Sequence, residues 1–454
     1  MSEQRDSGTP ASPAGGAALR RALGRWDLTA IGINQVIGGA IFLMPSQVAA
    51  QIGGWSPIAF LLAGLASLLV ALCFAEVGSR FEGTGGPYLY TRAAFGRFVA
   101  FEVGWMQWFT RVTSLASVAN GIALALGSYA PEAATGAGRV LLVTAIIATL
   151  AWINVRGIRE SAWVVNALTI GKLVPLGLFL AFGLARLDPA RVGPLPAITT
   201  EQAASAALLL VFVFGGFDVI PVPAGEARDP RRHVPFALVM TVLVVTVLFT
   251  LTQLVSTATL PGLAASRTPV ADAARVTMGA AGALLVAAGS ILSMVGNNAG
   301  GVLTGSRMVF ALAEHGDLPR ALARVHPHYR TPSNAILFTA GVALVLAASG
   351  SFVALAAASA VARLVTYAGT CAATLQLRRP RRAGSVAPAT FVPPLGPVVP
   401  VLAVLISLAI LISASRLRIL AGVAALGAGA VLFLMANRGA AGVSPMGSAG
   451  VGGS

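Results

Sequence analysis

The chain has 454 residues, of which 56% are hydrophobic and 10% are charged, and its mean hydropathy is +0.81. Average soluble domains carry about 25% charged residues, so this composition excludes an ordinary soluble protein. The formal net charge of +15 suits a nucleic-acid binder, but the arginines gather in loops between apolar stretches. That distribution is typical of a membrane protein and excludes nucleic acid as a partner.

The sequence predicts an all-α integral membrane protein, because segments that cross lipid must satisfy their backbone groups internally. Each apolar stretch is long enough for a crossing, which needs about 20 residues. The predicted spans are 29–51, 56–77, 98–127, 139–155, 162–186, 204–223, 235–258, 279–312, 333–349, 352–376, 395–414 and 417–436. Twelve spans place both termini on the same side of the bilayer.

The arginines orient the chain. They concentrate before the first span, at Arg20, Arg21 and Arg25, and after the tenth, at Arg378 and Arg379. The positive-inside rule then puts both termini in the cytoplasm of a multi-pass protein of the cell membrane. We expect disordered cytoplasmic tails at 1–25 and 438–454, because both are rich in small and polar residues. Residues 379–394 form a predicted cytoplasmic loop, and 395–437 hold two peripheral spans.

The first and sixth spans contain glycine where a continuous helix is expected. Gly38, Gly39 and Ala40 fall near the middle of the first, and Gly215 and Gly216 near the middle of the sixth. Such breaks are tolerated at membrane depth only beside protein or a cavity. Breaks five spans apart indicate two five-helix repeats, about 29–186 and 204–376, within a core over 26–378. The alternative is close helix packing through small residues.

Lys172 is the single lysine of the chain, and it lies within the apolar run Ala162–Phe182. A cation near the middle of a span costs at least ~3 kcal/mol on insertion scales, so it faces protein or water. A desolvated lysine releases its proton more readily than an arginine. We therefore predict a proton or ion site at Lys172; the alternative is a permanently charged lysine held by carbonyl groups.

Three more charges are embedded in predicted spans. Asp218 follows the sixth-span break and is a candidate to gate a pocket, bind a cationic group or relay protons, and Arg111 lies in the third span. An Arg111–Asp218 pair would neutralise both. Unpaired, Arg111 would suit a second carboxylate of an acidic substrate. Arg363 in the tenth span has no partner that the sequence identifies.

Other side chains give weaker signals. Trp105, Trp108, Phe109 and Phe217 are candidate covers of a pocket, although aromatic residues in helices usually pack. Glu76, Glu102 and Arg307 lie near span ends and suit gating or anchoring ion pairs. Two cysteines and four histidines give no disulfide framework and no metal site. No phosphate loop or nucleophile–base pair is present, so we expect neither an enzyme nor a cofactor.

Four elements in order resemble the amino acid–polyamine–organocation superfamily, in its amino acid permease branch. Val36–Pro45 is similar to the first-helix signature Ile-Gly-Ser/Thr-Gly-Ile-Phe-x-x-Pro, and Glu76–Tyr90 to the following loop with Gly-Gly-x-Tyr-x-Tyr. Phe212–Pro235 resembles the sixth helix, and Ser306–Gly316 the element after the eighth. The resemblance covers about residues 26–437.

The resemblance implies a leucine-transporter-type fold, a 5+5 inverted repeat with two peripheral helices, that moves an amino acid by alternating access. The substrate carboxylate would then meet Ile37, Gly38, Gly39 and Ala40. Its amino group would meet the carbonyl oxygens of Phe212, Phe214 and Gly215 in the sixth span. The chain departs from the family at Gly39, where a hydroxyl is usual, and at Ala40, where glycine is usual.

Several alternatives stay open at this point. Lys172 falls where proton-driven members carry a lysine and sodium-coupled ones bind Na⁺, which favours proton symport over amino acid exchange. A channel-like pore needs polar rings along a continuous path, and a non-transporting sensor is the other rival. The sequence identifies neither the amino acid carried nor any partner subunit.

Overall fold

The computed structural model describes residues 21, 23–83, 85–127, 130–156, 162–188, 192, 195–379, 384 and 386–441, the side chains of 162–170 and 437–441 excepted. The tail expected at 1–25 therefore lies mostly outside the described residues, as do most of the tail at 438–454 and part of the loop at 379–394.

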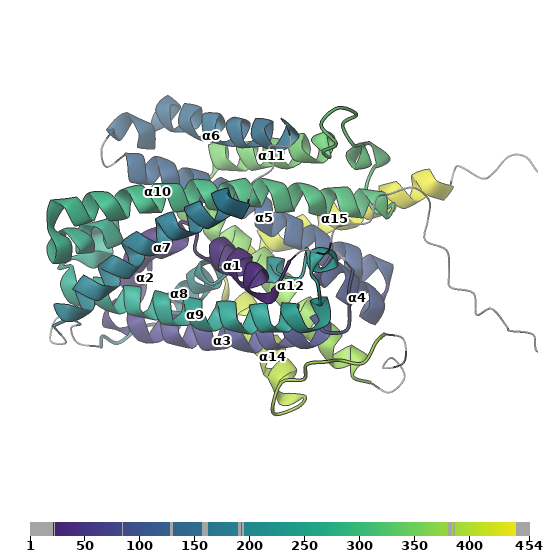
Figure 1. The fold of residues 1–454 in the computed structure, drawn as a ribbon, viewed down its shortest axis with the longest axis horizontal. Coiled ribbons are helices and arrows are strands. Elements are labelled where there is room, and N and C mark those ends of the chain that lie inside the picture. The colour runs from purple at the N-terminus through teal and green to yellow at the C-terminus, as the bar shows by residue number, and fades with distance from the viewer. Residues whose placement is uncertain are drawn as a thin grey trace, which may run out of the picture.

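The described residues fold into helices joined by short turns, and the chain order follows the predicted spans (Figure 1). The helices are α1 (Arg25–Val36), α2 (Ala40–Ile52), α3 (Ser56–Gly78), α4 (Pro87–Phe95), α5 (Arg97–Leu126), α6 (Gly136–Arg156), α7 (Ala162–Ala185), α8 (Thr200–Val213), α9 (Pro230–Thr259), α10 (Pro269–Glu314), α11 (Ser333–Ser349), α12 (Phe352–Leu377), α14 (Val398–Ser413) and α15 (Arg416–Ala441).

Seven segments of the described chain are long and apolar enough to cross a membrane, by length and composition. They are Ala40–Gly78, Arg97–Leu126, Gly136–Arg156, Pro230–Thr259, Pro269–Glu314, Phe352–Leu377 and Arg416–Ala436. Shorter apolar helices occur at Gly171–Ala185, Thr200–Val213, Ser333–Ser349 and Val398–Ser413. The chain is therefore a multi-pass membrane protein.

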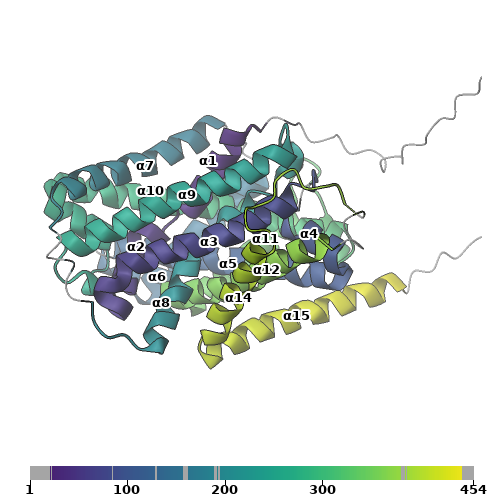
Figure 2. The same cartoon turned by 90° about the horizontal axis from the view of Figure 1, so that it is seen from below.

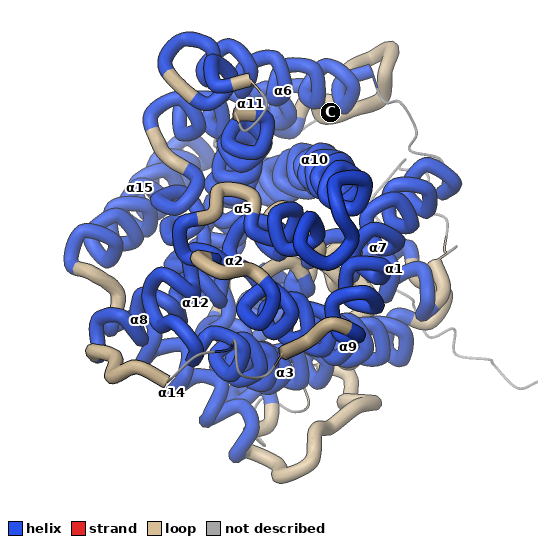
Figure 3. Tube along the Cα trace, turned by 90° about the vertical axis from the view of Figure 1, so that its left-hand side faces the viewer, coloured by secondary structure: helices blue, strands red, loops and turns tan. Residues whose placement is uncertain are grey.

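The long helices α3, α9 and α10 run along the longest axis of the molecule (Figure 1). α3 packs against α9, while α5 packs against both α10 and α12. α14 and α15 lie along one edge of the bundle and α7 along another (Figure 2). α6 and α11 pack together on a further side, so that α1, α2 and α12 lie toward the middle (Figure 3).

Local sequence sets the helix ends. Pro57, Pro87 and Pro230 each stand in the first turn of a helix, where the missing N–H costs nothing. Thr199 caps α8, because its hydroxyl oxygen accepts a hydrogen bond from the Gln202 N–H. The side-chain oxygen of Gln202 in turn accepts a hydrogen bond from the Thr199 N–H. α10 bends at Gly279, whose φ of 76° is not helical. The predicted eighth span begins at this bend.

Ion pairs tie the end of α3 to the end of α12. Buried Glu76 accepts bonds from Arg378 and lies 3.7 Å from Arg80. This confirms the ion pair expected for Glu76. Glu102 differs, because neither of its carboxylate oxygens has a hydrogen-bond partner among the described residues. The ion pair expected for Glu102 is thus not found among the described side chains and stays a prediction.

A second cluster joins α4 to the turn after α10. The Tyr88 hydroxyl donates to Asp317, whose carboxylate also accepts from Arg97 at 2.6 Å. Burial and the Asp317 carboxylate raise the pKa of Tyr88 to about 12, so the hydroxyl stays protonated and remains a donor.

Candidate functional site

The first predicted break is present between α1 and α2. α1 ends at Val36, Ile37 has non-helical dihedrals, and α2 begins at Ala40. The break leaves carbonyl groups at the end of α1 without the usual helical donors. Asn297 of α10 donates to the Gln35 carbonyl at 2.8 Å, and Ser293 donates to that of Ile37 at 3.0 Å.

Lys172 of α7 completes this set of donors. Its ammonium donates to the carbonyl oxygens of Asn34 at 3.0 Å and Ile37 at 2.9 Å, and the side chain is 0% exposed. Lys172 therefore lies beside the first break, at the same Ile37 carbonyl to which Ser293 of α10 donates. Its contacts are those of the carbonyl-held alternative, which does not by itself exclude a coupling role.

Side chains fill the space next to the first break. A Cβ atom placed on Gly38 would lie 2.9 Å from Cγ of Asn297. One placed on Gly39 would lie 2.6 Å from Cγ of Met294. Met294 thus fills the space that a larger residue at position 39 would need. Nothing in the sequence singled out Met294, since a methionine in an apolar span usually serves ordinary packing.

The second predicted break follows α8, which ends at Val213. Gly216 has a φ of 136°, and a Cβ placed there would lie 2.6 Å from the Gln35 carbonyl oxygen. The two breaks are therefore adjacent, as predicted. The chain continues in 3₁₀ turns, Phe217–Val219 and Ala224–Glu226, so the expected second half-helix is wrong. Pro221 and Pro223 explain this, because neither supplies an N–H.

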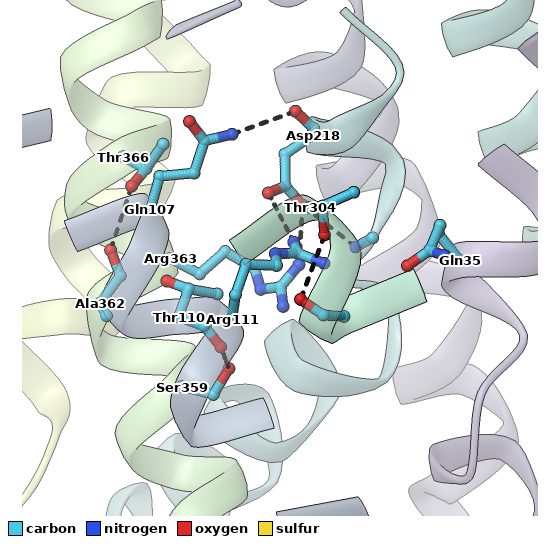
Figure 4. Close-up of polar contacts among 12 residues, drawn as sticks. Gln35, Gln107, Thr110, Arg111, Asp218, Thr304, Ser359, Ala362, Arg363 and Thr366 are labelled. Carbon is cyan, nitrogen blue, oxygen red and sulfur yellow. Dashed lines mark hydrogen bonds and ion pairs between the residues drawn. The ribbon is translucent and has the colours of Figure 1, made fainter. Parts of the chain in front are cut away.

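Asp218 lies between two arginines from different helices (Figure 4). Its carboxylate accepts from Arg111 of α5 at 2.7 Å and from Arg363 of α12 at 2.8 Å. It also accepts from the Gly216 N–H at 3.1 Å. The predicted Arg111–Asp218 pair is therefore confirmed. The sequence identified no partner for Arg363, and the structure supplies Asp218.

These three side chains are buried, with Arg111 5%, Arg363 2% and Asp218 1% exposed. Nε of both arginines has no hydrogen-bond partner among the described residues. A Cβ placed on Gly215 would lie 2.0 Å from Cζ of Arg363, so this guanidinium rests directly on the second break. The site thus combines excess positive charge with unused donors. An arginine in an apolar span was the sequence signal for it.

The aromatic residues expected to cover a pocket, Trp105, Trp108 and Phe217, make different contacts in the structure. The Trp105 indole donates to the Ala425 carbonyl of α15 at 2.8 Å, and the Trp108 indole to Thr339 of α11 at 3.2 Å. Both indoles hold α5 against outer helices, so they serve helix packing here and do not cover a pocket. Phe217 stacks on Tyr367, with ring centroids 5.2 Å apart, next to the second break. It remains a predicted cover.

A side cavity of about 330 Å³ lies between α3, α8, α12 and α14. Its walls are mainly alanine and larger aliphatic residues, with Ser67, Ser407 and Tyr367 as polar exceptions. Burying a zwitterion there would leave its charges without partners. The polar groups that suit an amino acid lie at the breaks instead.

Comparisons with known proteins identify the family of the chain. Residues 23–448 match the amino acid permease family. A branched-chain amino acid permease of Bacillus subtilis is 28% identical, covering 94% of this chain and 95% of its own length. A serine/threonine exchanger of the same organism is 30% identical over 72% and 76%. A methylthioribose transporter from it is 28% identical over 85% and 86%. These relatives are transporters and not enzymes, and the chain itself belongs to the amino acid permease family.

Proposed function

We propose that this protein is a secondary active transporter that carries an amino acid by alternating access, coupled to protons. The observation that carries the proposal is the contact of the two helix breaks, where Gly216 meets the Gln35 carbonyl. Paired broken helices place helix ends, with their partial charges, around a small polar ligand. The architecture proposed with it is twelve spans, a 5+5 inverted repeat over 26–378, and cytoplasmic termini.

The substrate's two charged groups fit the two breaks. N–H groups at the start of α2, at Gly39 and Ala40, suit the carboxylate, because a helix N-terminus favours an anion. Carbonyls at the end of α8, from Phe212 to Gly215, suit the ammonium. Asn297 and Met294 fill the space beside the first break. They have to shift when substrate binds.

The contacts of Lys172 favour protons over sodium ions. Its ammonium occupies the carbonyl oxygens of Asn34 and Ile37. A Na⁺ ion at this place would need the same oxygens and would be repelled by the ammonium. Loss of the proton would free those carbonyls and loosen the contact between α7 and α1. That change gives proton release a direct route to the first break.

The test uses purified protein in proteoliposomes with a pH-sensitive dye inside. We expect saturable amino acid uptake in Na⁺-free medium, accompanied by acidification of the lumen. Lys172→Met removes the charge at similar size. It should retain substrate exchange and lose the pH dependence of net uptake. Sodium-stimulated uptake by the unmodified protein would contradict proton coupling, as would an unaltered pH profile in Lys172→Met.

The rival within the class is obligatory exchange, which the name of the serine/threonine exchanger relative brings into consideration. Counterflow separates the two. An exchanger takes up labelled substrate only when unlabelled substrate is inside, whereas a symporter also fills empty vesicles. A channel shows neither saturation nor acceleration by substrate on the far side.

A further inference from the structure

The buried charges beside the second break do not balance. Two guanidinium groups, of Arg111 and Arg363, face the single carboxylate of Asp218. No other carboxylate pairs with either arginine in the part of the chain that the structure describes. One arginine would have sufficed to neutralise Asp218. A buried charge without a counterion is costly, and the cost is greater in a protein surrounded by lipid.

The arginines also keep part of their hydrogen-bonding capacity unused. Arg111 reaches Asp218 through Nη2 and Arg363 through Nη1, a single terminal nitrogen in each case. Nε of each has no partner among the described residues. A guanidinium binds a carboxylate best through two parallel N–H groups, and the edge that carries Nε is one such fork. Arg363, which bonds Asp218 through Nη1, thus keeps the edge formed by Nε and Nη2 for another carboxylate, whereas Arg111 already uses Nη2 and keeps Nε on that edge.

The position of these forks relates them to the proposed substrate site. The Arg363 guanidinium rests against Gly215, which belongs to the break proposed to bind the substrate ammonium. A side chain extending from an amino acid held there would therefore lie beside Arg363, next to the Asp218 carboxylate that accepts from the Gly216 N–H. Glycine at 215 is what permits this approach.

Resting on the proposed function, we propose that the transported amino acid is acidic, and that its side-chain carboxylate binds between Arg111 and Arg363. Asp218 holds the two arginines together in the unloaded protein. The incoming carboxylate brings the buried charge of the cluster to zero. A neutral side chain leaves the excess charge in place and offers nothing to the Nε donors.

The alternative reading of the cluster is a purely structural crosslink between α5, α12 and the turn after α8. A structural role explains the Arg111–Asp218 pair alone. It accounts neither for the second arginine nor for the unused donors. A bound inorganic anion such as chloride would satisfy both, so the experiment has to separate chloride from a substrate carboxylate.

The test compares matched pairs of amino acids that differ in one group. Binding of L-glutamate, L-glutamine, L-aspartate and L-asparagine to the purified full-length protein is measured by calorimetry and by thermal shift, in chloride-free buffer and in chloride. We expect an acidic amino acid to bind at least about tenfold more tightly than its amide, since hydrogen bonds to charged groups are the stronger ones. Chloride should compete only weakly.

Variants then assign the preference to the arginines. Arg363→Gln leaves Arg111 and Asp218 as a balanced pair, so the protein should fold and lose most of the preference for the acid. Asp218→Asn removes the resident carboxylate and should bind the acid more tightly than the unmodified protein. Arg232→Gln is the matched control, because Arg232 is 81% exposed and lies outside the cluster.

The outcomes separate this inference from the proposed function. Equal binding of acid and amide, with amino acid uptake present, overturns the inference and leaves the transporter assignment standing. So does an acid preference that survives in Arg363→Gln, or stabilisation by chloride alone. Absence of binding and uptake for every amino acid tested overturns both.

Discussion

The two helix breaks are built from similar glycine interruptions, yet their buried cations are handled in opposite ways. At the first break, the Lys172 ammonium is held by two carbonyl oxygens that α1 exposes, and Ser293 and Asn297 serve the neighbouring ones. At the second, Arg111 and Arg363 share one carboxylate and keep unpaired Nε donors. The first site holds one ammonium on backbone carbonyl oxygens, and the second holds two guanidinium groups on one carboxylate.

This difference suggests that proton coupling and substrate selectivity belong to different breaks of the proposed transporter. The Lys172 ammonium can lose its proton, and that loss would release two carbonyls and the helix that carries them. An arginine does not lose its proton in proteins, so the second site cannot couple to protons through its cations. Its spare donors suit recognition of a carboxylate. Coupling and selectivity are therefore assigned to different breaks.

The largest expected effect follows from removing the shared carboxylate. Asp218→Ala leaves two buried guanidinium groups facing each other, and breaking a buried pair in this way costs about 3–5 kcal/mol. We expect a large fall in the thermal midpoint of the purified protein, partly restored by an acidic amino acid. A midpoint like that of the unmodified protein would show that Asp218 does not balance the cluster.

Gly38→Leu changes the first break and leaves the arginines of the second break unchanged. The new side chain would enter the space that Asn297 fills, because even a Cβ there lies 2.9 Å from its Cγ. We expect a folded protein that binds no amino acid, acidic or neutral, since the carboxylate common to all of them loses its place. Unchanged uptake would move that carboxylate away from Gly38.

Gly215→Ala changes the second break and leaves the first break unaltered. The added methyl would lie 2.0 Å from Cζ of Arg363 and must displace the guanidinium. We expect acid binding to weaken about tenfold, the cost of roughly one charged hydrogen bond, while the amide is affected less. Calorimetry with glutamate and glutamine checks this. Equal weakening of both ligands would place Arg363 outside the specificity site.

The smallest effect tests a residue outside both breaks. Trp105→Phe removes the indole donor to the Ala425 carbonyl of α15. We expect a loss of about 1 kcal/mol of stability, the usual net worth of one hydrogen bond, with no change in substrate preference. A changed preference would return Trp105 to the substrate path, where the sequence first suggested it.

The sequence predicted the helices and the two breaks because both depend on local composition. Apolar runs of spanning length must be helical in lipid, and paired glycines at Gly38 and Gly215 weaken a helix wherever they occur. That Lys172 faces the protein interior was also predictable, since a cation in an apolar run is costly in lipid. Its place among the helices was implied by the family resemblance alone.

What the sequence could not supply were contacts between distant helices. Arg363 and Asp218 are 145 positions apart, and only the packing of α12 against α5 and the end of α8 brings them together. Met294 beside Gly39 is a packing outcome of the same kind. The loss of the second half-helix was in principle readable from Pro221 and Pro223, but the family pattern suggested a helix there.

The ratio of glutamate to glutamine affinity, measured by calorimetry in two variants side by side, tests the division between the breaks most directly. The account predicts that Arg363→Gln abolishes the preference for glutamate and that Lys172→Met, which removes the other cation, retains it. Loss of the preference in Lys172→Met, or its survival in Arg363→Gln, would contradict the assignment of selectivity to the second break.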